Sequence, residues 1–392
     1  MVNAVYDHMV AILIICVMFV SAVVVLPSLS IVNMQAVDNQ QLRNIALNLF
    51  NTLLLDAGRP PDWGSRFPFN QSVIEIFGLA YPEECSQYVL DADKVQRLDK
   101  ESPWFINYSR VRELLKLGKY GFTLEFFRPF TIGWSLEIVK NDKKVLFAVN
   151  VTRSGDGFPV PNAQVELSII AMARRIQNPE DAPVIIVNTP RTFYTDALGR
   201  CKGNETINLT NEYTLERAVA IIKVTVGGMS SMAVAQTSND FPQNWLKINT
   251  YGDTITLTFR GEFASNQTPQ GERRVYDIMA YTYDGGLTQV YNGRNDPVTS
   301  TKITHGLGFA YWNKTFPGLS GMEPVLLLFT VSVPNPRRAV IIVGPLLFWD
   351  SLKIFSFRPD TEYVGGGAIK LRRFVVISGL TYVAELTLWK EY

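Results

Sequence analysis

The chain has 392 residues, 47% hydrophobic and 19% charged, and its 37 basic and 36 acidic side chains give a formal net charge of +1. This balance argues against nucleic acid as a main partner, because phosphate binding requires a clustered surplus of basic residues. The two histidines, His8 and His305, leave little for histidine-based catalysis or a multi-histidine metal site. At about 100–200 residues per domain, the length allows two or three domains.

A long hydrophobic segment comes first along the chain. Met9–Met34 contains no charged residue, and the next one is Asp38. Its length is sufficient for a helix to cross the roughly 30 Å hydrocarbon layer of a membrane. Apolar residues continue at helical spacing towards residue 56, at Leu42, Ile45, Ala46, Leu49 and Leu53. We therefore predict a transmembrane or filament-core helix over residues 1–56.

Seven N-x-S/T triplets without an intervening proline follow the hydrophobic segment and are candidate N-glycosylation sites. Their asparagines are Asn70, Asn107, Asn150, Asn204, Asn208, Asn266 and Asn313. Because all seven lie after the segment, they favour a single-pass protein of the cell membrane whose C-terminal part is extracellular. This topology leaves only a short internal tail, which disfavours a signalling receptor.

A turn ends the predicted helix and opens a linking region over residues 57–118. The turn residues are Gly58, Pro60, Trp63 and Gly64, and Trp63 is a large apolar anchor for the turn. Two short helical stretches are expected after it, at 91–98 and 109–117. The Asp91 and Asp93 carboxylates suit helix capping, with calcium binding as the alternative.

The first third of the chain resembles the archaeal type IV pilin-like surface proteins. The resemblance depends on the hydrophobic helix, the G-x-P-x-x-W-G turn of residues 58–64, the F-G-L-A of 77–80, the D-x-D-K-V-x-R-L of 91–98 and the strand at 120–129. It implies an extracellular β-rich head on a helix that can bundle into a filament core. Pilin precursors carry a basic leader and an acid at the fifth position of the hydrophobic run. Here Met1–Ala4 contains no basic residue and Met9 occupies that fifth position.

The remaining sequence alternates short strand-like runs with turn signals, which is typical of β-sandwiches. The bend at 159–163 and the turn at 195–201 resemble those of immunoglobulin-like repeats. We predict an immunoglobulin-like sandwich over 119–238 and a second β-sandwich over 239–392. The predicted fold class is therefore mainly β, with a long N-terminal hydrophobic α-helix followed by two β-sandwich (immunoglobulin-like) domains.

Sites for covalent chemistry are few in this sequence. Cys16 lies in the hydrophobic segment, whereas Cys85 and Cys201 are a possible disulfide, with two free thiols as the alternative. Glycine-rich turns lack the lysine of a phosphate-binding loop, and no pattern singles out catalytic residues, metal ligands or a cofactor site. We therefore expect no enzymatic activity, no cofactor and no metal.

These observations predict an extracellular structural or adhesive protein, a pilin-like subunit anchored or polymerised through its N-terminal helix. The expected partners are the membrane, copies of the protein in a filament, and the surface layer or carbohydrate. Two alternatives remain: a non-polymerising membrane anchor associated with the surface layer, and an extracellular carbohydrate-active enzyme, which needs only two suitably spaced acids.

Overall fold

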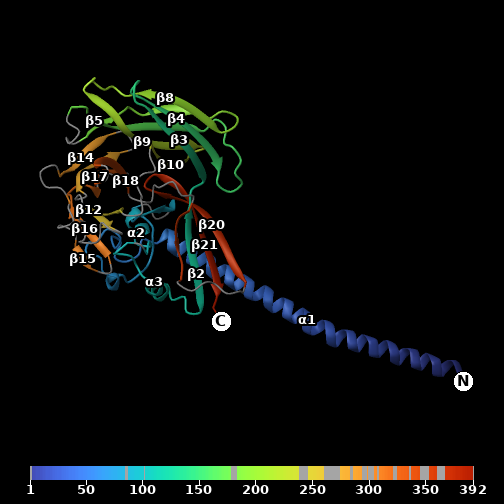
Figure 1. The fold of residues 1–392 in the computed structure, drawn as a ribbon. Coiled ribbons are helices and arrows are strands. Elements are labelled where there is room, and N and C mark those ends of the chain that lie inside the picture. Colours follow the sequence, from blue (N-terminus) through green and yellow to red (C-terminus); the bar gives the residue numbers. More distant parts are fainter. Residues whose placement is uncertain are drawn as a thin grey trace.

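A computed structural model describes most of the chain. The described residues are 2–83, 87–100, 102–177, 183–237, 246–259, 274–282, 286–293, 298, 304–306, 309–320, 325–334, 337–344, 353–359 and 367–391. Within the N-terminal helix, side chains are described at residues 6, 8–21 and 39–55. Figure 1 shows this helix projecting from a head built mainly of β-strands.

The helix α1 runs from Val2 to Leu55, and a rise of 1.5 Å per residue makes it about 80 Å long. Among the described residues, no helix combines the length and the apolar character needed to cross a membrane. The structure describes one uninterrupted run of exposed apolar side chains in α1, between His8 and Ser21. This run is shorter than the roughly 20 residues that a membrane span requires. This finding contradicts the predicted fold class in its long N-terminal hydrophobic α-helix, which we expected to be able to cross a membrane.

Strands from distant parts of the sequence form one sheet at the base of the head. We call it the base sheet, and its order is β1 (Val89–Leu90), β20 (Ala368–Ile377), β21 (Leu380–Lys390), β2 (Tyr120–Phe127) and β19 (Lys353–Phe357). The β1 strand is parallel to β20, and the other pairs are antiparallel. The C-terminal half of α1 contacts β20 and β21.

Two sheets with a shared core follow β2. One has the order β3-β4-β8 and the other β10-β9-β5-β6, with β7 also paired to β5. Their bounds are β3 Phe130–Val139, β4 Lys144–Arg153, β5 Gln164–Arg175, β6 Val184–Val187, β7 Arg191–Tyr194, β8 Arg200–Thr206, β9 Tyr213–Val226 and β10 Met229–Gln236. Alternate residues of β4, such as Val145, Phe147 and Val149, are buried between the sheets.

A further pair of sheets lies within residues 246–344. The orders are β11-β12-β16-β15 and β14-β13-β17-β18. Their bounds are β11 Leu246–Tyr251, β12 Thr254–Phe259, β13 Arg274–Thr282, β14 Leu287–Asn292, β15 Thr304–Gly306, β16 Phe309–Thr315, β17 Val325–Pro334 and β18 Arg337–Gly344. One apolar cluster includes residues of both sheets, so this pair is also a sandwich.

The structure is mainly β. Besides two sandwiches, however, its strands form the base sheet, which the predicted fold class does not contain. The β2 strand, within the predicted domain 119–238, pairs with β21 from the predicted domain 239–392. Residues near both ends of the head therefore complete the base sheet, and the two sandwiches lie between β2 and β19 in the sequence. Alternation predicts which face of a strand is buried, but not which distant strand is its partner.

The shared core of α1 and the base sheet generates a stability prediction. Leu386 of β21 is fully buried in this core. We expect Leu386→Ala to lower the free energy of unfolding by about 2–5 kcal/mol, because it removes buried methyl groups and leaves a cavity. Chemical denaturation followed by tryptophan fluorescence measures the change. The control is Leu198→Ala at a side chain that is 60% exposed, and an equal loss in both variants would contradict the prediction.

Buried Tyr382 on β21 generates a pH prediction. Burial raises the pKa of Tyr382 to about 12, although nearby Arg128 opposes the shift. Between pH about 10 and 12 the folded state retains this proton while the unfolded chain releases it, so the free energy of unfolding falls as pH rises. We expect Tyr382→Phe to make this decline shallower in denaturation series over that range. Tyr194→Phe, at an exposed position, is the control, and an unchanged slope in Tyr382→Phe would refute the assignment.

Candidate functional site: the exposed segment of α1 and its attachment to the head

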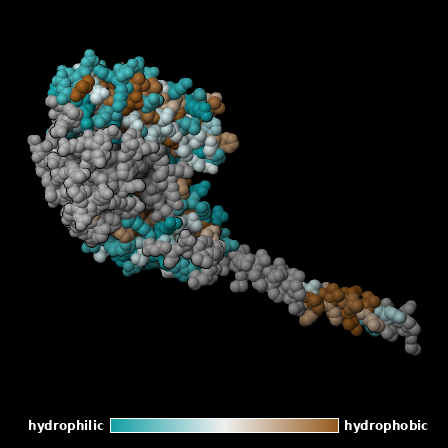
Figure 2. Space-filling model, viewed as in Figure 1, coloured by the Kyte–Doolittle hydropathy of each residue, from teal (hydrophilic) through white to brown (hydrophobic). Residues whose placement is uncertain are grey.

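The first part of α1 exposes large apolar side chains all around the helix. We call it the apolar segment, and its members are 52–70% exposed: Met9, Val10, Ile12, Leu13, Ile14, Ile15, Val17, Met18, Phe19 and Val20. Successive residues of a helix are about 100° apart, so these side chains cover every face. Figure 2 shows the segment as a hydrophobic band away from the head. A helix that is apolar on all sides is normally buried on all sides.

The opposite end of α1 has a different pattern. Its buried side chains recur every three or four residues and lie in the core of the base sheet: Leu42, Ala46, Leu49, Phe50, Leu53 and Leu54. Asn48 and Thr52 are exposed on another face, and the Thr52 hydroxyl donates to the Asn48 carbonyl at 3.0 Å. This end is therefore an ordinary amphipathic helix that fixes the apolar segment to the head.

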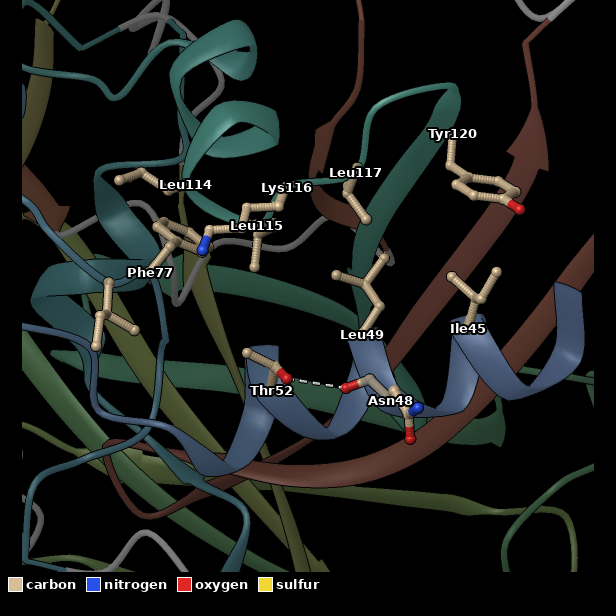
Figure 3. Close-up of a pocket in the computed structure, with 11 residues that line it drawn as sticks. Ile45, Asn48, Leu49, Thr52, Phe77, Leu114, Leu115, Lys116, Leu117 and Tyr120 are labelled. Carbon is tan, nitrogen blue, oxygen red and sulfur yellow. Dashed lines mark hydrogen bonds between the residues drawn. The ribbon is translucent and has the colours of Figure 1, made fainter. Parts of the chain in front are cut away.

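A groove runs beside this end of α1 and has a volume of about 460 Å³ (Figure 3). Its walls come from α1, from the segment before β1, and from the residues between α3 (Tyr108–Leu114) and β2. The lining is largely apolar and includes Ile45, Asn48, Leu49, Thr52, Ile76, Phe77, Leu114, Leu115, Lys116, Leu117 and Tyr120. The titratable side chains among these lining residues are Lys116 and Tyr120.

The predicted turn residues lie where α1 meets the head. Gly58 has a φ of +76°, and a Cβ there would lie 2.7 Å from the Ile76 carbonyl oxygen, so a side chain is excluded on two grounds. Trp63 is buried and donates from Nε1 to the Gly78 carbonyl at 3.1 Å. A Cβ at Gly64 would lie 2.5 Å from Lys94. The contacts of these residues, and of Pro60, are all with neighbouring parts of the head and shape the turn.

Two cations are completely buried against this turn. Lys94 and Arg97 lie in and just after the short helix α2 (Ala92–Gln96), and both are 0% exposed. The Lys94 ammonium donates to the Ala80 carbonyl at 2.8 Å and lies 3.4 Å from the Asp91 carboxylate. Asp91 also caps α2, accepting from the backbone N–H of Asp93 at 2.9 Å. These contacts agree with capping rather than calcium binding.

Arg97 connects three loop carbonyls and two aromatic rings. Its guanidinium donates to the carbonyls of Gly64 at 2.9 Å, Arg66 at 2.7 Å and Trp104 at 3.2 Å. It also lies 3.5 Å from the Tyr251 ring centre and 4.3 Å from that of Phe69. Burial lowers the pKa of Arg97 to about 10. A planar fork of donors suits this arrangement, and lysine could not replace it.

Six of the seven predicted glycosylation asparagines are exposed: Asn70, Asn107, Asn150, Asn204, Asn208 and Asn313. Asn266 lies outside the described residues. Asn150 on β4 and Asn204 on β8 lie on the outer face of the β3-β4-β8 sheet. Asn70 already uses its Oδ1 to accept from the Ser72 N–H at 3.0 Å. Exposure is necessary for modification, but glycosylation itself remains a prediction.

The cysteines provide no shared site in the described residues. Cys201 is a buried free thiol on β8, and burial raises its pKa. Its predicted partner, Cys85, lies outside the described residues. Cys16 is an exposed free thiol on the apolar segment. Within the part of the chain that the structure describes, no group of three His, Cys, Asp or Glu side chains is placed to hold a metal ion.

The comparisons with known proteins give little further information. No family model and no curated protein matches the chain. Trypsin-activated alpha-2-macroglobulin from Escherichia coli is similar over 63% of this chain and 18% of its own, with 9% identity and a TM-score of 0.20. Red sea bream transglutaminase is similar over 60% of this chain and 33% of its own, with 12% identity and a TM-score of 0.17. The chain spans about a third or less of either protein, and these TM-scores support no argument about function.

The buried arginine generates a prediction about the attachment of α1. We expect Arg97→Lys to lower the free energy of unfolding by at least about 3 kcal/mol, because a single ammonium cannot replace the guanidinium fork at all three buried carbonyls. Thermal and chemical denaturation measure the loss. The matched control is Arg66→Lys, whose side chain is 46% exposed and pairs with Asp62 at 3.0 Å, and should cost less than about 1 kcal/mol. Similar effects of the two changes would contradict the proposed importance of Arg97.

Proposed function

We propose that the protein is a structural subunit of the cell surface that associates with other copies through the apolar segment of α1 and displays its β-rich head outward. The observation that supports this proposal most directly is the exposure of apolar side chains on every face of the segment. Removal of such a surface from water gives roughly 25 cal/mol per Å². The proposal therefore assigns the main driving force of assembly to this segment.

Copies of the same helix are the occupants that fit the segment best. One partner helix would cover a single stripe, whereas side chains exposed all around need neighbours on several sides. The segment from Met9 to Val20 contains no charged residue, so a partner with charges along its contact surface would leave them unpaired. The apolar segments of other copies meet both requirements.

The head contributes a rigid attachment and an exposed surface. Because the last turns of α1 lie in the core of the base sheet, each subunit presents its head in a fixed relation to its helix. The exposed sequon asparagines lie on this head, in agreement with an outward-facing, glycosylated surface. An adhesive or structural role follows from such a display.

The assembly proposal predicts a strong effect of one charge in the apolar segment. We expect Leu13→Glu to reduce the assembled fraction of the purified full-length protein at least tenfold, since burial of an unpaired carboxylate costs several kcal/mol. Analytical ultracentrifugation and negative-stain electron microscopy measure assembly. Leu198→Glu places the same charge at an exposed leucine of the head and should leave assembly unchanged.

Two outcomes would overturn the proposal. The first is a parent protein that stays monomeric at all concentrations in the absence of detergent. The second is assembly of Leu13→Glu as efficient as that of the parent, which would place the contact elsewhere. A parent protein that binds lipid vesicles but does not associate with itself would overturn the proposal in the same way as the first outcome.

A further inference from the structure

A second cleft lies on the face of the base sheet opposite to α1. In β20, Ile369 and Leu371 pack against the core that contains α1, whereas Arg372 and Phe374 are exposed on the other face. The same division holds in β21, where even-numbered residues such as Tyr382 lie in that core. The first sandwich adjoins this outer face, and the Ser230 N–H of β10 donates to the Thr381 hydroxyl of β21 at 3.2 Å.

The cleft has a volume of about 490 Å³, within the range of about 300–1,000 Å³ that is typical of small-molecule sites. The base sheet contributes Arg372 and Phe374, and the β2–β3 connection contributes Arg128. The end of β4 and the turn after it contribute Arg153 and Asp156. Two exposed arginines, Arg153 and Arg372, therefore come to one cavity from separate segments, and the buried Arg128 also lines it.

The ion pairs around the cleft leave hydrogen-bond donors available. Arg153 pairs with Asp156 at 2.9 Å, and Arg372 pairs through Nε with Glu385. Glu385 also accepts from Lys370 at 2.7 Å, and Glu125 lies beside Glu385 on the neighbouring strand. The Arg372 side chain is 66% exposed, so the outer N–H groups of its guanidinium can reach a ligand.

An exposed aromatic ring accompanies these donors. Phe374 is 59% exposed, two residues from Arg372 on the same face of β20, and its ring provides a flat apolar surface. A planar guanidinium binds an oxyanion such as a carboxylate through two parallel hydrogen bonds. A sugar ring has an apolar C–H face that an aromatic ring can cover.

From these observations we propose that the cleft binds an acidic saccharide, with Arg153 and Arg372 holding a sugar carboxylate and Phe374 covering the sugar ring. An acidic peptide would also satisfy the guanidinium groups. Such a peptide has no apolar ring face to pack on the exposed ring of Phe374, so we favour the saccharide. This inference is independent of the proposed assembly, because none of its residues belongs to α1.

The test measures binding of a defined probe to the full-length protein by isothermal titration calorimetry. The probes are a tetrasaccharide containing glucuronic acid, a neutral N-acetylglucosamine tetrasaccharide and a tetraglutamate peptide. We expect the acidic saccharide to bind, the other two to bind at least tenfold more weakly, and its affinity to fall as salt is raised. Arg372→Gln and Phe374→Ala should each weaken binding about tenfold.

Matched controls keep the result specific to the cleft. Arg200→Gln and Tyr194→Ala make similar changes at exposed positions of the first sandwich outside the cleft, and both should bind like the parent. Circular dichroism spectra establish that every variant is folded. Equal binding of the neutral saccharide, preference for the peptide, no binding of any probe, or unchanged binding by Arg372→Gln would each overturn the proposal.

Discussion

The burial of Lys94 and Arg97 is the constraint on which the rest of the structure depends. Two uncompensated charges in a protein interior would cost several kcal/mol each, so the surrounding chain must supply acceptors at defined places. The acceptors come from the turn after α1, the loop after α2 and the segment before β1. Lys94 and Arg97 together therefore determine the path of three separate backbone segments at the point where the helix joins the head.

The same short helix also attaches the second sandwich. The Gln96 side-chain oxygen accepts from the backbone N–H of Thr250 at 3.1 Å, and the Asp93 carboxylate accepts from that of Gly252 at 2.7 Å. The Tyr251 hydroxyl lies 2.7 Å from that of Ser102. Since polar contacts of this kind are directional, they fix the orientation of the β11 strand more closely than apolar packing alone would. The α2 helix thus connects α1, the linking region and the second sandwich in one network.

The sequence predicted the elements better than their partners. The periodicity of apolar residues indicated a helix to about residue 56, and α1 ends at Leu55. Alternation also indicated strands at β4 and β21. It could not indicate that β2 pairs with β21, because a period of two specifies a buried face and not a neighbour more than 250 residues away. The sequence did not predict the burial of Lys94 and Arg97, because lysine and arginine are seldom fully buried. The D-x-D-K-V-x-R-L pattern was the sequence signal that contained them.

The base sheet separates two surfaces that have opposite chemistry. One face is covered by the amphipathic end of α1, which carries the uncharged apolar segment, and the other carries Arg372 and the exposed Phe374 of the cleft. Strand geometry enforces this separation, because neighbouring residues of β20 and β21 point to opposite faces. Contacts that cover the apolar segment therefore need not cover the cleft. In the proposed assembly, a subunit would therefore be held by its helix while the cleft proposed for the saccharide stays open.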